Sequence, residues 1–285
     1  MPALTDALRE RPLVLDGGLG THLEERGNDL SGRLWSARLL RDDPAEVRAT
    51  HAAFVDAGAD VLITASYQLG FGYGIDDDEV EVLLRRSVDV AREAGGRFVA
   101  ASVGPYGAMR ADGSEYTGDY DLGRRELRAW HCRRLHVLAD SGADVFAIET
   151  IANEAEVEAL CAELDGLGMP AWISLSASST AFADGSLRDA LAVAASGSGV
   201  VAVGVNCCPP DDVDRALALA PAGVDTVVYP NSGEQWDAVA RRWQGIPGVP
   251  TAAVREWVAQ GARLVGGCCR TTPAHIAALA AAMRG

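Results

Sequence analysis

A tight turn followed by a buried parallel strand is predicted by the stretch Ser141-Gly142-Ala143-Asp144-Val145-Phe146-Ala147-Ile148-Glu149-Thr150. The turn connects this strand to the helix that precedes it. Gly142 stands just past the expected helix end, where glycine is common because it adopts the left-handed conformation freely. The run Val145–Ile148 is apolar without alternation, as in strands that are covered on both faces. The same turn recurs in Ala57-Gly58-Ala59-Asp60 and again in Gln260-Gly261-Ala262-Arg263. The chain therefore repeats one helix–turn–strand unit.

Apolar runs and helical patterns alternate along the whole chain. Strands are expected at Pro12–Asp16, Asp60–Ser66, Arg97–Val103, Asp144–Glu149, Ala171–Ser176, Val200–Asn206, Asp225–Pro230 and Ala262–Gly267. Helices are expected at Pro44–Ala57, Asp78–Ala94, Leu122–Ala139, Glu154–Leu164, Leu187–Ala195, Asp211–Ala220, Val249–Gln260 and Pro273–Met283. Eight such alternations predict an α/β fold, a (β/α)8 TIM barrel, and the absence of a linker-like stretch predicts a single domain over residues 1–285. A doubly wound open sheet is the alternative.

Composition limits the partners of this chain. It has 25 basic and 40 acidic residues, a net charge of −15, so nucleic acid and anionic membrane surfaces are not expected to bind. No apolar stretch approaches the roughly 18 residues of a membrane span. The start of the sequence lacks a basic segment followed by an apolar one, so secretion is not expected. We expect a cytoplasmic protein with reduced thiols that acts on small molecules; the sequence does not predict its oligomeric state.

Polar and reactive side chains gather at the predicted strand ends. In a parallel barrel these carboxyl ends form the catalytic face, so the pattern indicates an enzyme. The groups are Asp16-Gly17, Ser66-Tyr67, Glu149-Thr150, Asn206-Cys207-Cys208, Asn231 and Cys268-Cys269. We take Ser66, Tyr67, Asn206 and Asn231 as candidate substrate contacts.

Four of the six cysteines follow the sixth and eighth predicted strands. Thiolates from two neighbouring strand ends suit an open zinc site, which has three protein ligands and a fourth position for substrate. Buried cysteines, or a vicinal disulfide within Cys207-Cys208 or Cys268-Cys269, are the alternatives. Cys132 and Cys161 fall within helical patterns and are interpreted as small core residues. The histidines are not expected to be ligands.

Two carboxylates also end predicted strands. Glu149 closes an otherwise apolar run, and a buried carboxylate needs a partner, for which a substrate ammonium group is suitable. Asp16 either shares that role or caps the following turn.

These motifs resemble those of the zinc-dependent homocysteine S-methyltransferases, in particular the single-domain branch that uses S-methylmethionine or S-adenosylmethionine. The resemblance covers almost the whole chain in order. The matching segments are Leu15-Asp16-Gly17-Gly18, Leu23–Gly27, Leu34-Trp35-Ser36-Ala37, Ile63–Gln68, Ser102–Gly107, Asp112–Tyr116, Tyr229–Glu234 and Gly266–Pro273.

The resemblance implies a zinc ion held by Cys207, Cys268 and Cys269, with the sulfur of homocysteine as its fourth ligand. It also implies that Asp16 and Glu149 hold the substrate amino group, next to the amide of Gly17. Cys208 departs from the family pattern, which usually has one cysteine at this point.

The function implied is transfer of a methyl group from S-methylmethionine or S-adenosylmethionine to the thiolate of L-homocysteine, giving methionine. Trp35 or Tyr67 lies over the sulfonium in this interpretation, and packing is the equal alternative for both rings. Other possibilities are betaine as donor, selenocysteine or another thiol as acceptor, and a non-catalytic zinc or thiol sensor. The sensor would have a closed four-cysteine site that includes Cys208.

Overall fold

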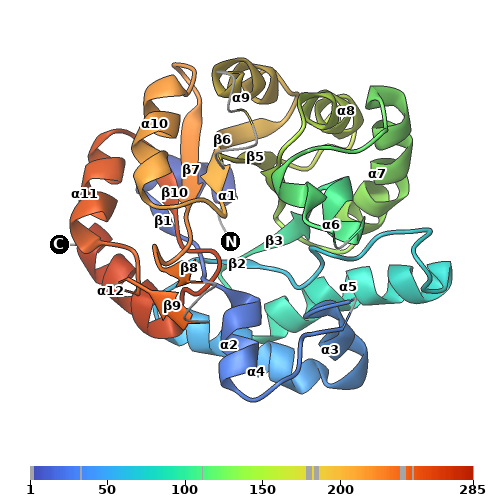
Figure 1. Cartoon of the computed structure of the whole chain (residues 1–285), viewed down its shortest axis with the longest axis horizontal. Coiled ribbons are helices and arrows are strands. Elements are labelled where there is room, and N and C mark those ends of the chain that lie inside the picture. Colours follow the sequence, from blue (N-terminus) through green and yellow to red (C-terminus); the bar gives the residue numbers. More distant parts are fainter. Residues whose placement is uncertain are drawn as a thin grey trace.

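A ring of helices surrounds an eight-stranded parallel barrel in the computed structural model of this chain (Figure 1). The structure describes residues 3–32, 34–110, 112–177, 182, 186–237, 242–245 and 247–284. The barrel strands are β1 (Leu13–Val14), β2 (Val61–Ile63), β3 (Phe98–Val103), β4 (Val145–Ile151), β5 (Ala171–Ser176), β6 (Val200–Asn206), β7 (Asp225–Tyr229) and β10 (Ala262–Val265).

The order of the strands closes the sheet on itself. Hydrogen-bonded neighbours run β1-β10-β7-β6-β5-β4-β3-β2, and a parallel bridge between Leu15 and Val61 joins the two ends. Every pairing within this sheet is parallel. The predicted TIM barrel is therefore confirmed, and the open sheet is wrong.

Eight helices form the outer ring at the predicted places. They are α4 (Pro44–Asp56), α5 (Asp77–Glu93), α7 (Arg124–Ala139), α8 (Glu154–Leu164), α9 (Leu187–Ala195), α10 (Asp211–Leu219), α11 (Thr251–Ala259) and α12 (Pro273–Arg284). The glycines of the repeated turn have left-handed backbone, with φ of 98° at Gly58, 84° at Gly142 and 108° at Gly261. This conformation reverses the chain from each helix into the next strand.

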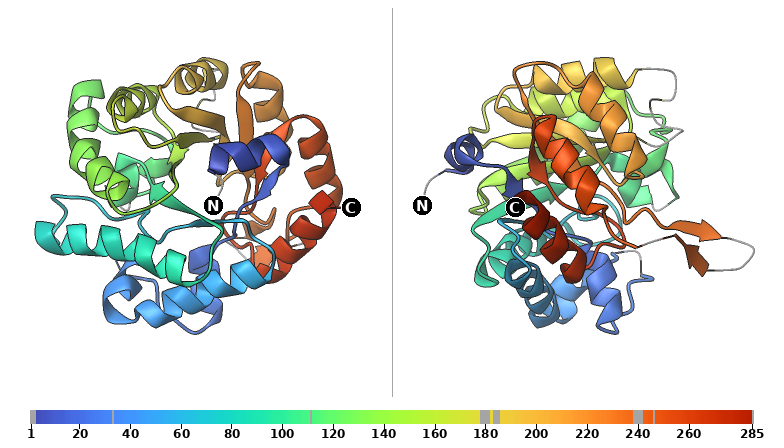
Figure 2. Two further views of the ribbon diagram at one scale, coloured as in Figure 1. Left: turned by 180° about the vertical axis from the view of Figure 1, so that it is seen from behind. Right: turned by 90° about the vertical axis from the view of Figure 1, so that its left-hand side faces the viewer.

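Several short elements add to the barrel. They are α1 (Leu4–Glu10), α2 (Leu19–Glu25), α3 (Ala37–Asp42), α6 (Tyr106–Arg110), the 3-10 turn η1 (Ser114–Tyr116) and an antiparallel hairpin of β8 (Gln235–Asp237) and β9 (Arg242–Gln244). Figure 2 shows α1 and the hairpin at opposite ends of the molecule.

The amino-terminal helix closes one end of the barrel. Leu4, Ala7 and Leu8 of α1 are buried in the same apolar cluster as the inward-facing strand residues, which include Phe98 and Trp172. A second, larger cluster lies between the strands and the outer helices. Because α1 covers the amino ends of the strands, the mouth of the barrel lies at their carboxyl ends, where the predicted site residues stand.

Within the described ranges, every helix is too short or too polar to span a membrane.

Candidate active site

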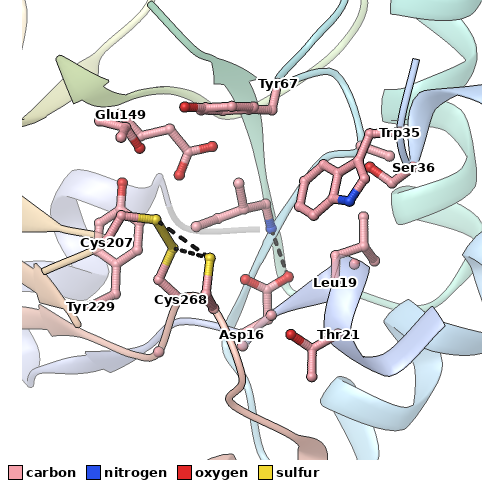
Figure 3. A pocket seen from close by; sticks show the side chains of 18 of the residues that line it. Asp16, Leu19, Thr21, Trp35, Ser36, Tyr67, Glu149, Cys207, Tyr229 and Cys268 are labelled. Carbon is pink, nitrogen blue, oxygen red and sulfur yellow. Dashed lines mark hydrogen bonds between the residues drawn. A yellow bond between two sulfur atoms is a disulfide. The ribbon is translucent and has the colours of Figure 1, made fainter. Parts of the chain in front are cut away.

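A cavity of about 120 Å³ lies at the carboxyl ends of the strands. Its walls come from the loops after β1, β2, β6 and β10, from the last residues of β4, from the start of α2 and from the segment before α3, with one side chain from η1 and one from the end of β7. The lining residues are Asp16, Gly17, Gly18, Leu19, Gly20, Thr21, Trp35, Ser36, Ile63, Thr64, Ala65, Tyr67, Tyr116, Glu149, Thr150, Cys207, Tyr229, Gly267, Cys268 and Cys269. In Figure 3 the carboxylates of Asp16 and Glu149 point toward its centre, between the cysteine sulfurs and the indole of Trp35.

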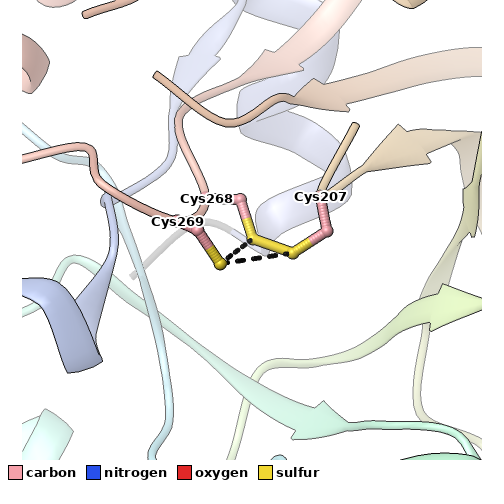
Figure 4. A group of neighbouring side chains, drawn as sticks. All are labelled: Cys207, Cys268 and Cys269. Carbon is pink, nitrogen blue, oxygen red and sulfur yellow. Dashed lines mark hydrogen bonds between the residues drawn. A yellow bond between two sulfur atoms is a disulfide. The ribbon is translucent and has the colours of Figure 1, made fainter. Parts of the chain in front are cut away.

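Three cysteine sulfurs converge on one wall of this cavity (Figure 4). Cys269 Sγ lies 3.9 Å from Cys207 Sγ and 4.0 Å from Cys268 Sγ. The structure pairs Cys207 with Cys268 as a disulfide across two strand ends, which differs from the vicinal pairings considered above. The bond is possible because the ends of β6 and β10 bring the two Cα atoms to 5.5 Å, within the range that a disulfide spans.

The three sulfurs, once reduced, fit a tetrahedral metal ion. Sulfurs that each lie about 2.3 Å from such an ion are about 3.8 Å apart, close to the two open distances here. Cys208 is not part of this group: its side chain is fully buried in the core, and burial raises the pKa of its thiol to about 12. This arrangement therefore favours a site of three cysteines over a closed site of four.

Hydrogen bonds to neighbouring loops hold the cysteine segment in place. Asn231 Oδ1 accepts a hydrogen bond from the amide of Cys269 at 3.1 Å. Thr271 Oγ1 donates to the carbonyl of Cys268 and accepts from the amide of Gly18. At Gly18 a side chain cannot fit, because a Cβ would lie 2.6 Å from the Cys268 carbonyl oxygen. The loops after β1 and β10 thus pack backbone against backbone.

Asp16 is a buried carboxylate at the end of β1, only 1% exposed. Its Oδ2 accepts a hydrogen bond from the amide of Ile63 at 2.9 Å and lies 3.9 Å from His51 Nδ1. Burial raises the pKa of Asp16 well above its ordinary value, and the charge of Glu149 adds to this rise. Burial also lowers the pKa of His51 to about 4, so this ring is neutral and brings no positive charge to Asp16.

Glu149 lies in a more polar setting at the end of the apolar part of β4. Ser102 Oγ donates a hydrogen bond to its Oε1, and the hydroxyl of Tyr229 is a second partner. Burial raises the pKa of Glu149 to about 7, although these hydrogen bonds and the charge of the buried Arg134 oppose the rise. A cation that enters the cavity would restore the charged carboxylate, so the site favours a positively charged group.

Backbone strain is concentrated around this cavity. Five non-glycine residues of the described chain have left-handed φ, and three line the cavity: Trp35 at 47°, Thr150 at 64° and Cys207 at 49°. Such conformations cost about 1–3 kcal/mol each and commonly mark functional sites. The surroundings must therefore hold these three residues in place.

Asn206 is one of the groups that do so. It is fully buried, and its Oδ1 accepts a hydrogen bond from the amide of Thr150 at 2.7 Å while its Nδ2 donates to Thr150 Oγ1 at 2.8 Å. These two bonds fix the left-handed residue that directly follows Glu149. Asn206 does not itself line the cavity, and its predicted contact with substrate stays a prediction.

The other predicted residues divide in the same way. Gly17, Trp35 and Tyr67 line the cavity, whereas Ser66 and Asn231 are not among its lining residues. Ser66 Oγ donates to the carbonyl of Ser102, the residue that contacts Glu149. The indole of Trp35 packs directly over Gly20, where a Cβ would collide with it, so this ring both packs and faces the cavity.

Several site residues were not predicted as substrate contacts. Leu19 and Tyr116 line the cavity from short helical elements, and Ser102 and Arg134 act on Glu149 from neighbouring strands and helices. The position of Tyr229 could have been predicted from the sequence, because this residue ends an apolar strand immediately before Pro230-Asn231.

The two cysteines predicted as core residues are only half-buried. Cys132 lies on α7 and Cys161 on α8, and each residue is of intermediate exposure. The helical pattern predicted which helices hold these cysteines but not how far each residue is buried.

Comparison with known proteins relates the whole barrel to one family. The family profile described as homocysteine S-methyltransferase matches residues 13–283. Homocysteine S-methyltransferase 4 of Zea mays is 45% identical, over 95% of this chain and 89% of its own length. The homocysteine methyltransferase MmuM of Escherichia coli has been solved in a metallated form, with a TM-score of 0.83 and 40% identity over 95% of this chain and 96% of that one. Its oxidized form has a TM-score of 0.82 at the same identity, over 95% of each chain.

Proposed function

This chain belongs to the homocysteine S-methyltransferase family, and from that premise we propose that it transfers a methyl group from a sulfonium donor to the sulfur of L-homocysteine, giving methionine. We further propose that the metal is zinc, held by Cys207, Cys268 and Cys269. The observation that carries the proposal is the meeting of three sulfurs and two buried carboxylates around one cavity.

The carboxylates account for the amino-acid end of the acceptor. Asp16 and Glu149 both have pKa values raised by burial, and among the described residues that line the cavity there is no lysine or arginine to balance them. An α-ammonium group supplies that charge and can donate hydrogen bonds to both side chains. The amide of Gly17 borders the same space, where it suits the substrate carboxylate. Homocysteine held in this way would direct its side chain toward the cysteine sulfurs.

A zinc ion at the three cysteines would hold the acceptor sulfur as a thiolate, since a free thiol with pKa near 8.5 is only about 3% ionised at pH 7. The role of the three cysteines is electronic as well as structural. Their three negative charges exceed the charge of a divalent ion, so they keep a fourth sulfur electron-rich and nucleophilic. The cysteines must be reduced to bind the ion, so the active form that we propose is the reduced protein in a reducing compartment, for which we propose the cytoplasm.

Methyl transfer requires the acceptor sulfur to approach the methyl carbon in line with the bond from that carbon to the donor sulfur. The acceptor thiolate forms the new S–C bond while the donor S–C bond breaks, and the bonding electron pair stays on the donor sulfur as a neutral thioether. Opposite charges disappear in this step, so a cavity with little water favours it. The apolar and aromatic side chains of Leu19, Trp35 and Tyr67 limit the water that surrounds the donor.

A donor comparison tests the function as a whole. Purified, reduced and zinc-loaded protein is assayed for methionine with homocysteine and either S-methylmethionine or S-adenosylmethionine. We expect turnover with at least one of them. Betaine as donor and selenocysteine as acceptor complete the panel, and absence of methylated product from every pair would contradict the proposal.

Trp35 provides a specific test of sulfonium binding. The indole faces the cavity, and cation–π attraction of about 0.5–2 kcal/mol corresponds to roughly a 2- to 30-fold change in affinity. We expect Trp35→Leu to raise the KM of the donor by that factor and to change the KM of homocysteine less, with Trp35→Phe in between. A variant that lowers the melting temperature but leaves the donor KM unchanged would assign the ring to packing alone.

Asn206 tests how the site is held together. Asn206→Ala removes both hydrogen bonds to Thr150, so the residue after Glu149 is free to leave its left-handed conformation. We expect about a tenfold rise in the KM of homocysteine, which corresponds to about 1.4 kcal/mol, with the bound zinc unchanged. Asn206→Asp keeps one acceptor and should retain part of the affinity. An unchanged KM in Asn206→Ala would remove this residue from the positioning of Glu149.

A further inference from the structure

A second group of metal-ligand side chains lies on the outer helical ring, outside the barrel mouth. Cys132 and His136 are on α7, and Glu163 is near the end of the adjacent helix α8. All three ligand atoms lie within 4.8 Å of one another. Nothing in the methyl-transfer chemistry uses these residues.

The spacing of the two helices sets this geometry. Cys132 and His136 are four residues apart, so they share one face of α7, and that face packs against α8. Cys132 Sγ lies 3.8 Å from His136 Nδ1, which lies 3.8 Å from Glu163 Oε1. A tetrahedral zinc ion separates a sulfur, a nitrogen and an oxygen ligand by about 3.3–3.6 Å, so shifts of a few tenths of an ångström would complete these two edges.

The carboxylate is already oriented for this role. Glu163 is only 8% exposed, and its Oε2 accepts a hydrogen bond from Arg128 Nε at 2.8 Å. The other oxygen, Oε1, therefore faces the histidine. Metal sites typically hold a ligating carboxylate in place through a hydrogen bond from a neighbouring side chain, as Arg128 does here. The His136 side chain is 57% exposed, which leaves the open side of the triangle accessible from solvent.

We propose that Cys132, His136 and Glu163 form a second metal site, which binds a divalent transition ion and joins α7 to α8. A thiolate, an imidazole and a carboxylate favour Zn²⁺ or Co²⁺ over Mg²⁺ and Ca²⁺, which prefer oxygen ligands alone. The fourth ligand is water. Binding releases the Cys132 thiol proton to solvent and involves no change of oxidation state.

Two local interactions oppose binding. His136 Nδ1 is 2.8 Å from the carbonyl oxygen of Cys132, and this contact must give way before the nitrogen can bind a metal. The hydrogen bond with Glu163 raises the pKa of the Cys132 thiol, so the thiol must lose its proton against this interaction. Each contributes little compared with the coordination of three ligands to zinc, so together they weaken the site without abolishing it.

Cobalt titration tests the proposal. Reduced, metal-free protein is titrated with Co²⁺, and thiolate-to-cobalt absorption and bound equivalents are measured together. We expect two equivalents in the wild type and one in Cys132→Ser or His136→Ala. In the variant Cys207→Ser/Cys268→Ser/Cys269→Ser, which lacks the thiols of the barrel mouth, we expect one equivalent that disappears when Cys132→Ser is added.

The matched control is Cys161→Ser. Cys161 is another half-buried helical cysteine, but its sulfur lies against the carbonyls of Val193 and Ala194 and is outside the cluster. This variant should keep two equivalents, and Cys132→Ser should keep full methyl-transfer activity. If Cys132→Ser and His136→Ala both bind as many equivalents as the wild type, with the same absorption, the second site does not exist.

Discussion

Replacing Cys268 with alanine is expected to abolish tight metal binding and to lower homocysteine methylation by at least about 10³-fold. The variant leaves two thiols, which no longer form the three-sulfur face seen at the barrel mouth. Loss of the ion removes roughly a thirtyfold gain in thiolate at pH 7. It also removes the orientation of the acceptor sulfur, which contributes considerably more. Metal analysis of the reduced protein and a methionine assay measure the two effects.

The neighbouring cysteine provides the control. Cys208→Ala removes a buried thiol of the core that is outside the three-sulfur group, so it should lower stability but keep the bound metal and most activity. Chelation of the wild type should reproduce the Cys268→Ala defect, and added zinc should reverse it only in the wild type. Metal and activity that survive in Cys268→Ala would contradict the proposed ligand set.

Replacing Glu149 with glutamine is expected to impair function and to stabilise the ligand-free protein. The amide cannot neutralise a substrate ammonium group, and a charge-assisted hydrogen bond contributes about 1.5–3 kcal/mol, so kcat/KM for homocysteine should fall by roughly 10- to 200-fold. Ser102 can still donate its hydrogen bond to the amide oxygen of glutamine. Steady-state kinetics at several homocysteine concentrations measures the loss.

The stability effect depends on pH in a defined direction. Burial raises the pKa of Glu149 from 4.5 to about 7, so the folded protein binds this proton more tightly than the unfolded chain. The resulting stabilisation is present in full below pH 4.5 and is lost as the pH rises through about 7. At pH 8 the wild type should therefore be about 3 kcal/mol less stable than Glu149→Gln, and the difference should vanish near pH 4.

Thermal unfolding of reduced, metal-free protein at pH 8 and pH 4.5 measures this difference. Saturating homocysteine should narrow it at pH 8, because the ammonium group partners only the wild-type carboxylate. A Glu149→Gln variant that is less stable than the wild type at pH 8 would show that Glu149 is not a destabilising buried charge.

Most of the barrel was predictable because its signals are local. The apolar run of β4 and the left-handed glycine before it can be recognised within ten residues. The predicted bounds of α8 and α9 agree with the structure. The elements that were missed have weaker local signals: α1 is only seven residues long, and its burial depends on the open end of the barrel that it covers.

The site was predicted less evenly. Residues next to one another at a strand end were all taken as candidate contacts, but the backbone after the strand decides which side chain reaches the cavity. Cys207, which follows β6 with left-handed φ, and Tyr67, in the turn after β2, line the cavity. Asn206 and Ser66 do not line it and bond instead to Thr150 and Ser102.

The sequence by itself determined the class of the fold, the family and the residue types at the mouth of the barrel, because periodicity, glycine turns and the cysteine motifs are properties of short segments. Only the tertiary structure decided how those residues meet. Closure of the sheet brings Cys207 within reach of Cys268, and burial in a shared cavity raises the pKa values of Asp16 and Glu149. The packing of α7 on α8 likewise brings Glu163 to Cys132 and His136. Distances between segments and the exclusion of water arise only when the chain is folded.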